Sequence, residues 1–179
     1  MRISKDEITI RSAGMDDAPL LNRWWNDGRV MAHAGFPNGL GEPLERTRDL
    51  VALNEQGLDQ RCLIEIDAVP VGECSYSVYD GEVEIGIKIC EAEYQNRGYG
   101  TRILRLLIEF LFTDEAINRP RPVERVFLDT NLNNTRAQHV YEKLGFVRTG
   151  VRVDSWVDQL GQPQSAVDYE LRREAFFQS

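Results

Sequence analysis

The clearest pattern in the chain is an alternation of apolar and other residues over residues 82–89. Every second residue from Val83 to Ile89 is aliphatic, and this period of two predicts a β-strand. A second pattern covers residues 101–112, where aliphatic and aromatic residues recur at helical spacing. That spacing predicts a helix with a broad buried face. A polar turn with two glycines, residues 95–100, lies between the strand and the helix.

The other apolar patterns are shorter and lie on both sides of this segment. A first helix is predicted from about Ala18 to Val30, and Trp24 and Trp25 within it are expected in the core. Residues 31–43 contain three glycines and two prolines, which predicts a loop. Further helices are predicted at residues 44–56 and 134–144, and further strands at residues 8–11, 61–66, 71–79, 123–128, 146–153 and 167–171. This order predicts an α/β domain built around a mixed sheet.

The length of the chain favours one domain. Its 179 residues are enough for a full hydrophobic core, and no repeat or linker rich in Pro, Gly or Ser divides them. We therefore expect a single domain over residues 1–179, with its core between residues 8 and 173. The longest apolar stretches are interrupted by charged residues, which favours neither export nor membrane insertion. The expected location is the cytoplasm.

Charge and metal-binding residue types narrow the possible partners. The net charge is −8, which argues against general binding to nucleic acid, because such proteins carry a basic surface. An acidic surface instead favours cationic partners, and free amines are cations at neutral pH. The three cysteines and two histidines lack the spacing of a metal-ligand set or a disulfide framework, so we expect no metal.

The turn Gln95-Asn96-Arg97-Gly98-Tyr99-Gly100 has the composition of an anion-binding site. Backbone N–H groups at a glycine-rich turn point toward a phosphate together with the positive end of the following helix, and Arg97 and Arg102 would add charge. A dinucleotide-binding fingerprint does not fit, because Ile103 stands where its third glycine is required, and no Gly-Lys-Ser/Thr of a phosphate-binding P-loop is present. Glycines that serve only the turn remain the structural alternative.

A second motif follows after one helix and one strand. It reads Asn134-Thr135-Arg136-Ala137, then Tyr141, then Gly145-Phe146. The order of a strand, Gln/Arg-x-x-Gly-x-Gly/Ala, a helix, a strand and this second motif resembles the GNAT superfamily of N-acetyltransferases. The resemblance is strong over residues 82–146 and weaker over residues 8–171. In detail it is most similar to the branch that contains aminoglycoside and ribosomal-protein acetyltransferases.

The resemblance implies a fold and an activity. The expected fold is a mixed, mostly antiparallel sheet of about seven strands flanked by about four helices. The expected activity is acetyl transfer from acetyl-CoA to a primary amine of a small molecule or a protein N-terminus, by direct attack on the thioester. The alternative is a catalytically silent module that binds acyl-CoA or regulates another protein. The sequence does not indicate an oligomeric state, and a homodimer is one option.

The resemblance also implies which residues hold acetyl-CoA. The pyrophosphate is expected on the glycine-rich turn, and the pantetheine arm beside the main chain of the 82–89 strand. The residues expected to bind the cofactor are Ile87, Ile89, Gln95, Asn96, Arg97, Gly98, Tyr99, Gly100, Thr101 and Asn134.

Four residues are candidates for proton transfer. Tyr141 is the expected general acid, since its phenol could donate to the departing thiolate. Glu84 is the first candidate for the base that takes the amine proton, Asp129 is the second and Glu73 the third. A core tyrosine and surface carboxylates are the plain alternatives.

The acceptor pocket is expected between the 31–43 loop and the last hairpin. The residues expected to contact the acceptor are His33, Phe36, Glu42, Trp156 and Asp158. His139 is expected to be a solvated histidine, because it lies two residues before Tyr141 on another face of the helix. Gly86 aligns with an acidic strand residue of the aminoglycoside-modifying relatives, which disfavours modification of an antibiotic.

Overall fold

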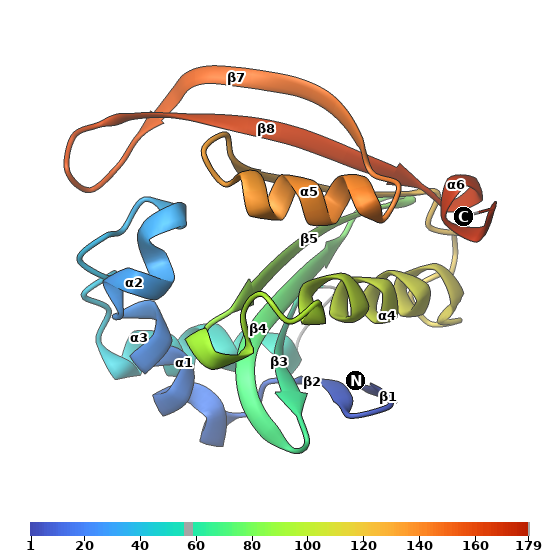
Figure 1. Ribbon diagram of the computed structural model, residues 1–179. Coiled ribbons are helices and arrows are strands. Elements are labelled where there is room, and N and C mark those ends of the chain that lie inside the picture. Colours follow the sequence, from blue (N-terminus) through green and yellow to red (C-terminus); the bar gives the residue numbers. More distant parts are fainter. Residues whose placement is uncertain (56–58, 179) are drawn as a thin grey trace.

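The computed structural model describes residues 1–55 and 59–178. At its centre is one eight-stranded sheet with the order β1-β2-β3-β4-β5-β6-β8-β7 (Figure 1). All neighbouring strands are antiparallel except β5 and β6, which are parallel. The strands are β1 (Arg2–Lys5), β2 (Ile8–Ser12), β3 (Asp59–Ile66), β4 (Val69–Val78), β5 (Glu82–Ile89), β6 (Arg125–Asn131), β7 (Val147–Val157) and β8 (Pro163–Arg172).

Helices cover both faces of the sheet. Those described are α1 (Ala18–Trp25), α2 (Gly28–Met31), α3 (Leu44–Ala52), α4 (Tyr99–Thr113), α5 (Thr135–Lys143) and α6 (Arg173–Gln178). The apolar sides of α4 and α5 pack in one core cluster with alternate residues of the strands, and α1, α2 and α3 form a second cluster on the opposite face. Figure 1 shows α5 between β8 and α4, with α1, α2 and α3 grouped at the left of the view.

The two strongest sequence patterns produce the two best-predicted elements. The alternation over 82–89 is β5 itself, with Val83 and Ile85 buried against the α4 side. The helical pattern is α4, in which Leu104, Leu107 and Leu111 are fully or almost fully buried. Hydrophobic burial of one face therefore fixes both the register of the strand and the rotation of the helix.

The feature that creates a site is the separation of β5 from β6. The two strands pair only where Glu82, Val83 and Glu84 lie beside Arg125, Val126 and Phe127. Beyond this point β5 continues to Ile89 and β6 to Asn131 without pairing to each other. The sheet is thus open in its middle, between two strands that both remain paired on their other edges.

Several predicted boundaries differ from the structure. The expected 18–30 helix is two helices, because Asp27 accepts a hydrogen bond from the backbone N–H of Arg29 at 2.9 Å and so caps a new helix. The expected 44–56 helix ends at Ala52 and continues as a 3₁₀ turn to Glu55, and the last residue of the predicted range, 56, lies outside the described residues. The eighth strand, β1, and α6 were not predicted, because each is short and β1 is largely exposed.

Candidate functional site

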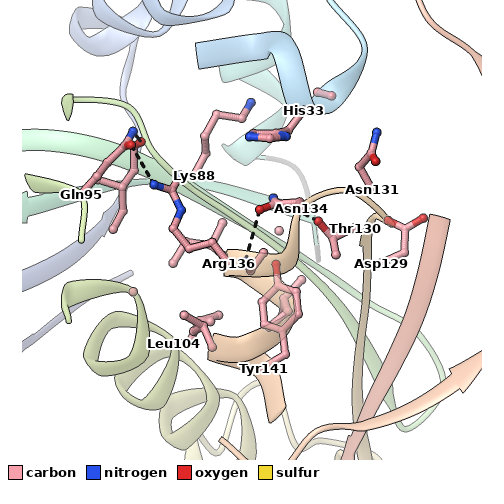
Figure 2. Close-up of a pocket in the computed structure, with 18 of the residues that line it drawn as sticks. His33, Lys88, Gln95, Leu104, Asp129, Thr130, Asn131, Asn134, Arg136 and Tyr141 are labelled. Atoms are coloured by element: carbon pink, nitrogen blue, oxygen red, sulfur yellow. Dashed lines mark hydrogen bonds between the residues drawn. The ribbon is translucent and has the colours of Figure 1, made fainter. Parts of the chain in front are cut away.

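A cavity of about 630 Å³ lies where β5 and β6 separate. Residues of α4 and α5 line it from one face of the sheet, and residues of α2 and the 3₁₀ turn that follows line it from the other face. Figure 2 shows Leu104 and Tyr141 on one side of this pocket and His33 on the opposite side. A cavity of this size suits a cofactor or small-molecule ligand, and here it passes through the sheet.

The predicted glycine-rich turn forms one end of the cavity. Asn96 and Gly98 adopt positive φ angles of 61° and 79°, and α4 begins directly afterwards at Tyr99. The Gln95 side chain fixes the turn to the sheet, because its Nε2 donates to the carbonyl of Ile89 at 2.9 Å. The turn residues that line the cavity are Gln95, Asn96, Gly98, Tyr99, Gly100 and Thr101. The unpaired N–H groups of the first α4 turn therefore face a space that can receive an anion.

Arg136 supplies a cation at the same end. It is the second residue of α5, and its Nη1 lies 3.2 Å from Gln95 Oε1 and 3.3 Å from Asn96 Oδ1 (Figure 2). Both acceptors are neutral amide oxygens, so the guanidinium charge is not cancelled by these contacts. Arg136 therefore joins the two helix N-termini and adds positive charge beside the predicted anion site.

Neither of the two cations that the sequence suggested for this role lines the cavity. Arg97 is exposed and is not among the residues that line the cavity. Arg102 is held by Glu7 at 2.6 Å and by Asp6 at 3.2 Å, at the turn between β1 and β2. The hydrogen bond from Arg102 lowers the pKa of Glu7 to about 2, so this ion pair stays formed at neutral pH.

The main chain of β5 forms the floor of the opening. The Tyr79 N–H donates to the Glu82 carbonyl at 2.8 Å, which identifies the even-numbered residues of β5 as those bonded to β4. The odd-numbered residues therefore turn their N–H and C=O groups to the other edge. Beyond the pairing of Glu84 with Phe127, the Ile85 carbonyl and both main-chain groups of Ile87 face the gap instead of β6, so a ligand in the gap can pair with the strand as another strand would.

Tyr141 projects from α5 into the cavity and is 6% exposed. Its ring packs against Phe146 and Tyr169, with ring centroids 5.8 Å and 5.6 Å away. Burial, followed by the nearby Asp129 carboxylate and Tyr169, raises the pKa of the phenol to about 12. Among the described residues its hydroxyl has no hydrogen-bond partner, so it is a fixed neutral donor directed at whatever occupies the cavity.

Asn134 closes the site between β6 and α5. Its side-chain oxygen accepts from the Ala137 N–H at 3.3 Å and caps α5, while the residue also lines the cavity. The predicted cofactor contact at Asn134 thus coincides with a structural capping role, which orients the N-terminus of α5 toward the cavity.

The first two of the three carboxylates predicted as bases, Glu84 and Asp129, border different depressions of the structure. Asp129 lines the cavity, but Arg152 binds it in an ion pair and also binds Asp168 at 2.8 Å. Glu84 does not line this cavity. It lies where β5 and β6 are still paired, beside Phe127, and it borders a separate depression on the sheet.

Glu84 is therefore removed from the site by the register of the sheet. Its Oε2 accepts a hydrogen bond from the Tyr79 hydroxyl at 3.2 Å, and the side chain is exposed. Glu73, the third candidate, is buried and accepts a hydrogen bond from Trp25 Nε1 at 2.9 Å. It is not among the residues that line the cavity, so Asp129 is the one candidate base that reaches it in the described part of the chain.

Of the residues predicted to contact an acceptor, His33 and Trp156 line the cavity. Phe36 is 38% exposed and is not a lining residue. Glu42 and Asp158 have structural roles instead: the Glu42 carboxylate lies 3.3 Å from Arg46, and Asp158 accepts backbone hydrogen bonds within the β7–β8 turn.

The turn of the β7–β8 hairpin is hydrogen-bonded to the loop after α2. The Gln159 N–H donates to the Gly35 carbonyl at 2.8 Å, and the Gln159 side chain bonds to Asn38 N at 2.9 Å and to the Gly39 carbonyl at 3.0 Å. A Cβ at Gly35 would lie 2.2 Å from the Trp156 ring, so only glycine permits this approach. Figure 1 shows the hairpin reaching across toward α2, and Trp156 of β7 lines this side of the cavity.

Three cationic residues that line the cavity were not predicted as site residues. They are Arg29 on α2, Lys88 on β5 and Arg136 on α5. The sequence held a signal for two of them. Arg136 is part of the second motif, and Lys88 lies on the polar face of the predicted 82–89 strand, between Ile87 and Ile89. Arg29 carried no comparable pattern.

Residues 1–55 and 59–178 contain no group of three or more His, Cys, Asp or Glu side chains placed to hold a metal ion. No helix in this part of the protein is both long and apolar enough to span a lipid bilayer.

Comparison with known proteins gives one family and several relatives. Residues 7–147 match the model of the acetyltransferase (GNAT) domain. The chain is 26% identical to aminoglycoside N(6′)-acetyltransferase type 1 of Klebsiella pneumoniae over 168 residues, which cover 82% of this chain and 77% of that protein. It is 22% identical to spermidine N(1)-acetyltransferase of Vibrio cholerae over 160 residues, with 84% of each chain covered.

Solved structures agree at the level of the fold. The spermidine N-acetyltransferase from Vibrio cholerae in complex with CoA and spermine superposes with a TM-score of 0.82 at 18% identity, covering 96% of this chain and 98% of that one. A ribosomal L7/L12 α-N-protein acetyltransferase in complex with coenzyme A also gives a TM-score of 0.82, at 17% identity, with 98% and 99% covered.

Proposed function

The chain belongs to the GNAT family of acetyltransferases, and on this basis we propose that it transfers an acetyl group from acetyl-CoA to a primary amine of a small molecule or of a protein N-terminus. One observation carries the proposal: an anion cradle, an open strand edge and a buried phenol meet in a single cavity. A module that only binds acyl-CoA would need the first two features but not the third.

The residues that line the cavity fit acetyl-CoA along its length. The pyrophosphate would lie on the N–H groups that begin at Gly98 and continue into α4, next to the Arg136 guanidinium. The pantetheine amides would pair with the open edge of β5 at Ile85 and Ile87. The thioester would then enter the gap in the sheet near Tyr141.

The chemistry requires one bond to form and one to break. The neutral amine attacks the thioester carbonyl carbon, a C–N bond forms, and the C–S bond breaks to release the thiolate of CoA. Tyr141 is directed at the cavity as a neutral donor and would hydrogen-bond the sulfur as its charge develops. The amine loses its proton to water, and Asp129, the described carboxylate that lines the cavity, would receive it through solvent.

A coupled assay tests this function directly. The protein is mixed with acetyl-CoA and a panel of amines, release of the thiol is followed spectroscopically, and the acetylated amine is identified by mass spectrometry. We expect thiol release that depends on an amine and yields one acetylated product for each turnover. CoA binding by calorimetry without amine-dependent thiol release would instead identify a silent binding module.

A further inference from the structure

The charges around the acceptor side of the cavity are unusual for an enzyme that would bind a polycation. Arg29, His33 and Lys88 line this side. Asp129 is the one carboxylate among the described lining residues, and Arg152 already binds it. The net charge of −8 therefore does not extend to the surface that an acceptor would contact.

Lys88 has donor capacity that its neighbours do not use. Its Nζ lies 3.4 Å from Glu73 Oε1, an oxygen that also accepts from Trp25 Nε1 at 2.9 Å. Its nearer neighbour is Met31 Sδ at 3.0 Å, and a thioether is a weak acceptor. An ammonium group has three donors, so Lys88 can still bind an anionic oxygen in the cavity. Figure 2 shows its side chain rising from β5 toward the segment that carries His33.

Arg29 adds charge at the rim. One edge of its guanidinium pairs with Asp27, through Nε at 3.1 Å and Nη2 at 2.7 Å. The Nη1 group is directed elsewhere, and the side chain is 92% exposed. The planar group therefore keeps donors for a carboxylate that approaches from solvent.

Gly86 of β5 also lines the cavity, and it has no side chain that could carry a charge there. A Cβ there would lie 3.1 Å from Ser75 Oγ, which is a small adjustment for a side-chain hydroxyl, and the residue has no positive φ. A carboxylate can thus be introduced at this position without a backbone change. The native chain leaves this position neutral, so a second ammonium group on an acceptor would meet cations and no free acid.

We propose, on the premise of the acetyltransferase function above, that the acceptor is an amine that also carries a carboxylate, bound by Lys88 and Arg29 with His33 beside them. The carboxylate would hold the acceptor on the α2 side of the sheet while its amine reaches through the gap toward the thioester. Such an acceptor could be a free amino acid or a peptide with an acidic residue near its N-terminus, which share this chemistry.

Matched acceptors test the proposal. One series compares ω-amino carboxylates with the alkylamine and the diamine of the same chain length. A second compares dipeptides that differ only in Glu, Gln or Lys at the second position. We expect kcat/KM for the anionic member to exceed that for the cationic member roughly tenfold or more, in at least one series. The series that shows the preference identifies the source of the carboxylate.

Variants locate the effect. Lys88→Met should lower kcat/KM for the anionic acceptor roughly tenfold while leaving the CoA affinity within about twofold. Since this change removes a cation beside the buried Glu73 and could impair folding, Arg29→Gln at the exposed rim is the second variant, with an expected loss of about two- to fivefold. Gly86→Asp should shift preference toward the diamine, and Gly86→Asn is its neutral control.

The outcomes separate this proposal from the function on which it rests. Turnover of neutral or cationic amines at rates equal to or above those of their anionic partners would overturn the proposal and leave the acetyltransferase function intact. An anionic preference that survives in both Lys88→Met and Arg29→Gln would also overturn it. No turnover of any acceptor by protein that binds CoA would overturn both.

Discussion

Removing the Tyr141 hydroxyl tests the chemistry at the centre of the site. Tyr141→Phe keeps the ring, which is packed between Phe146 and Tyr169, and deletes a hydroxyl without a hydrogen-bond partner among the described residues. The variant should therefore fold normally, with a melting temperature close to that of the parent. Any loss of turnover can then be assigned to the missing donor.

The pKa of Tyr141 limits what the hydroxyl can do. Burial and the Asp129 carboxylate raise this pKa to about 12, whereas a thiol has an ordinary pKa of about 8.5. The two pKa values differ by about 3.5, so complete transfer of the phenol proton to a free thiolate is uphill by roughly 5 kcal/mol. A hydrogen bond to the developing thiolate is worth about 1.5–3 kcal/mol instead. Tyr141→Phe should thus lower kcat roughly ten- to hundredfold.

Two measurements test this expectation. Steady-state kinetics over a range of pH give kcat for the parent and the variant, and calorimetry gives their affinities for CoA. The CoA affinity should be unchanged, because the hydroxyl acts mainly as charge develops on sulfur. The parent and variant profiles should run parallel below pH 10, since Tyr141 stays neutral until about pH 12. A falling limb below pH 10 that only the parent shows would mean that Tyr141 transfers a proton, and an unchanged kcat would exclude it from the chemistry.

Three other substitutions test separate parts of the structure. Gly100→Asp should weaken CoA binding at least tenfold in calorimetry by placing a like charge at the pyrophosphate, whereas Gly100→Ala should not, because its Cβ meets no atom closer than 4.0 Å. Asp129→Asn should slow turnover at neutral pH and recover in part as the pH rises, whereas a matching loss in Glu84→Gln would contradict the placement of Glu84 outside the cavity. Arg11 donates two hydrogen bonds to the Asp17 carboxylate, at 2.7 Å and 2.8 Å, so Arg11→Met should lower the free energy of unfolding by about 2 kcal/mol at pH 7 in urea titrations. Because Arg11 lowers the pKa of Asp17, that contribution is present above the unfolded pKa of about 3.9 and is lost in stronger acid, so the difference should narrow there.

The parts of the fold that follow from local pattern were predictable. β5 and α4 each bury one face, so their periodicity reports their structure directly. The turn from Gln95 to Thr101 follows from its glycines and from the helix after it. By contrast, β1 has only four residues and gains its place by pairing with β2, and no periodic signal of that length can be distinguished from a loop.

The composition of the site was harder to predict, because it depends on where two strands stop pairing. Glu84 and Lys88 lie on the same face of β5, and the sequence alone gives no reason to separate them. The structure pairs β5 with β6 at Glu84 and covers Lys88 with Met31 of α2. One residue is consequently excluded from the cavity and the other is brought into it. Register across non-consecutive segments therefore decides which polar residues act together.

Long-range structure also decides which acidic side chains near the cavity are paired with cations. Asp27, Glu73 and Asp168 are close to the cavity, yet each faces a cation instead of the space inside. The acidic excess of the chain is thus neutralised around the site and remains on the outer surface. A cationic amine can be attracted to the protein by that surface and still require a neutral form, or an attached carboxylate, to occupy the cavity. The acceptor should therefore be sought by the charge beside its amine, not by the overall charge of the protein.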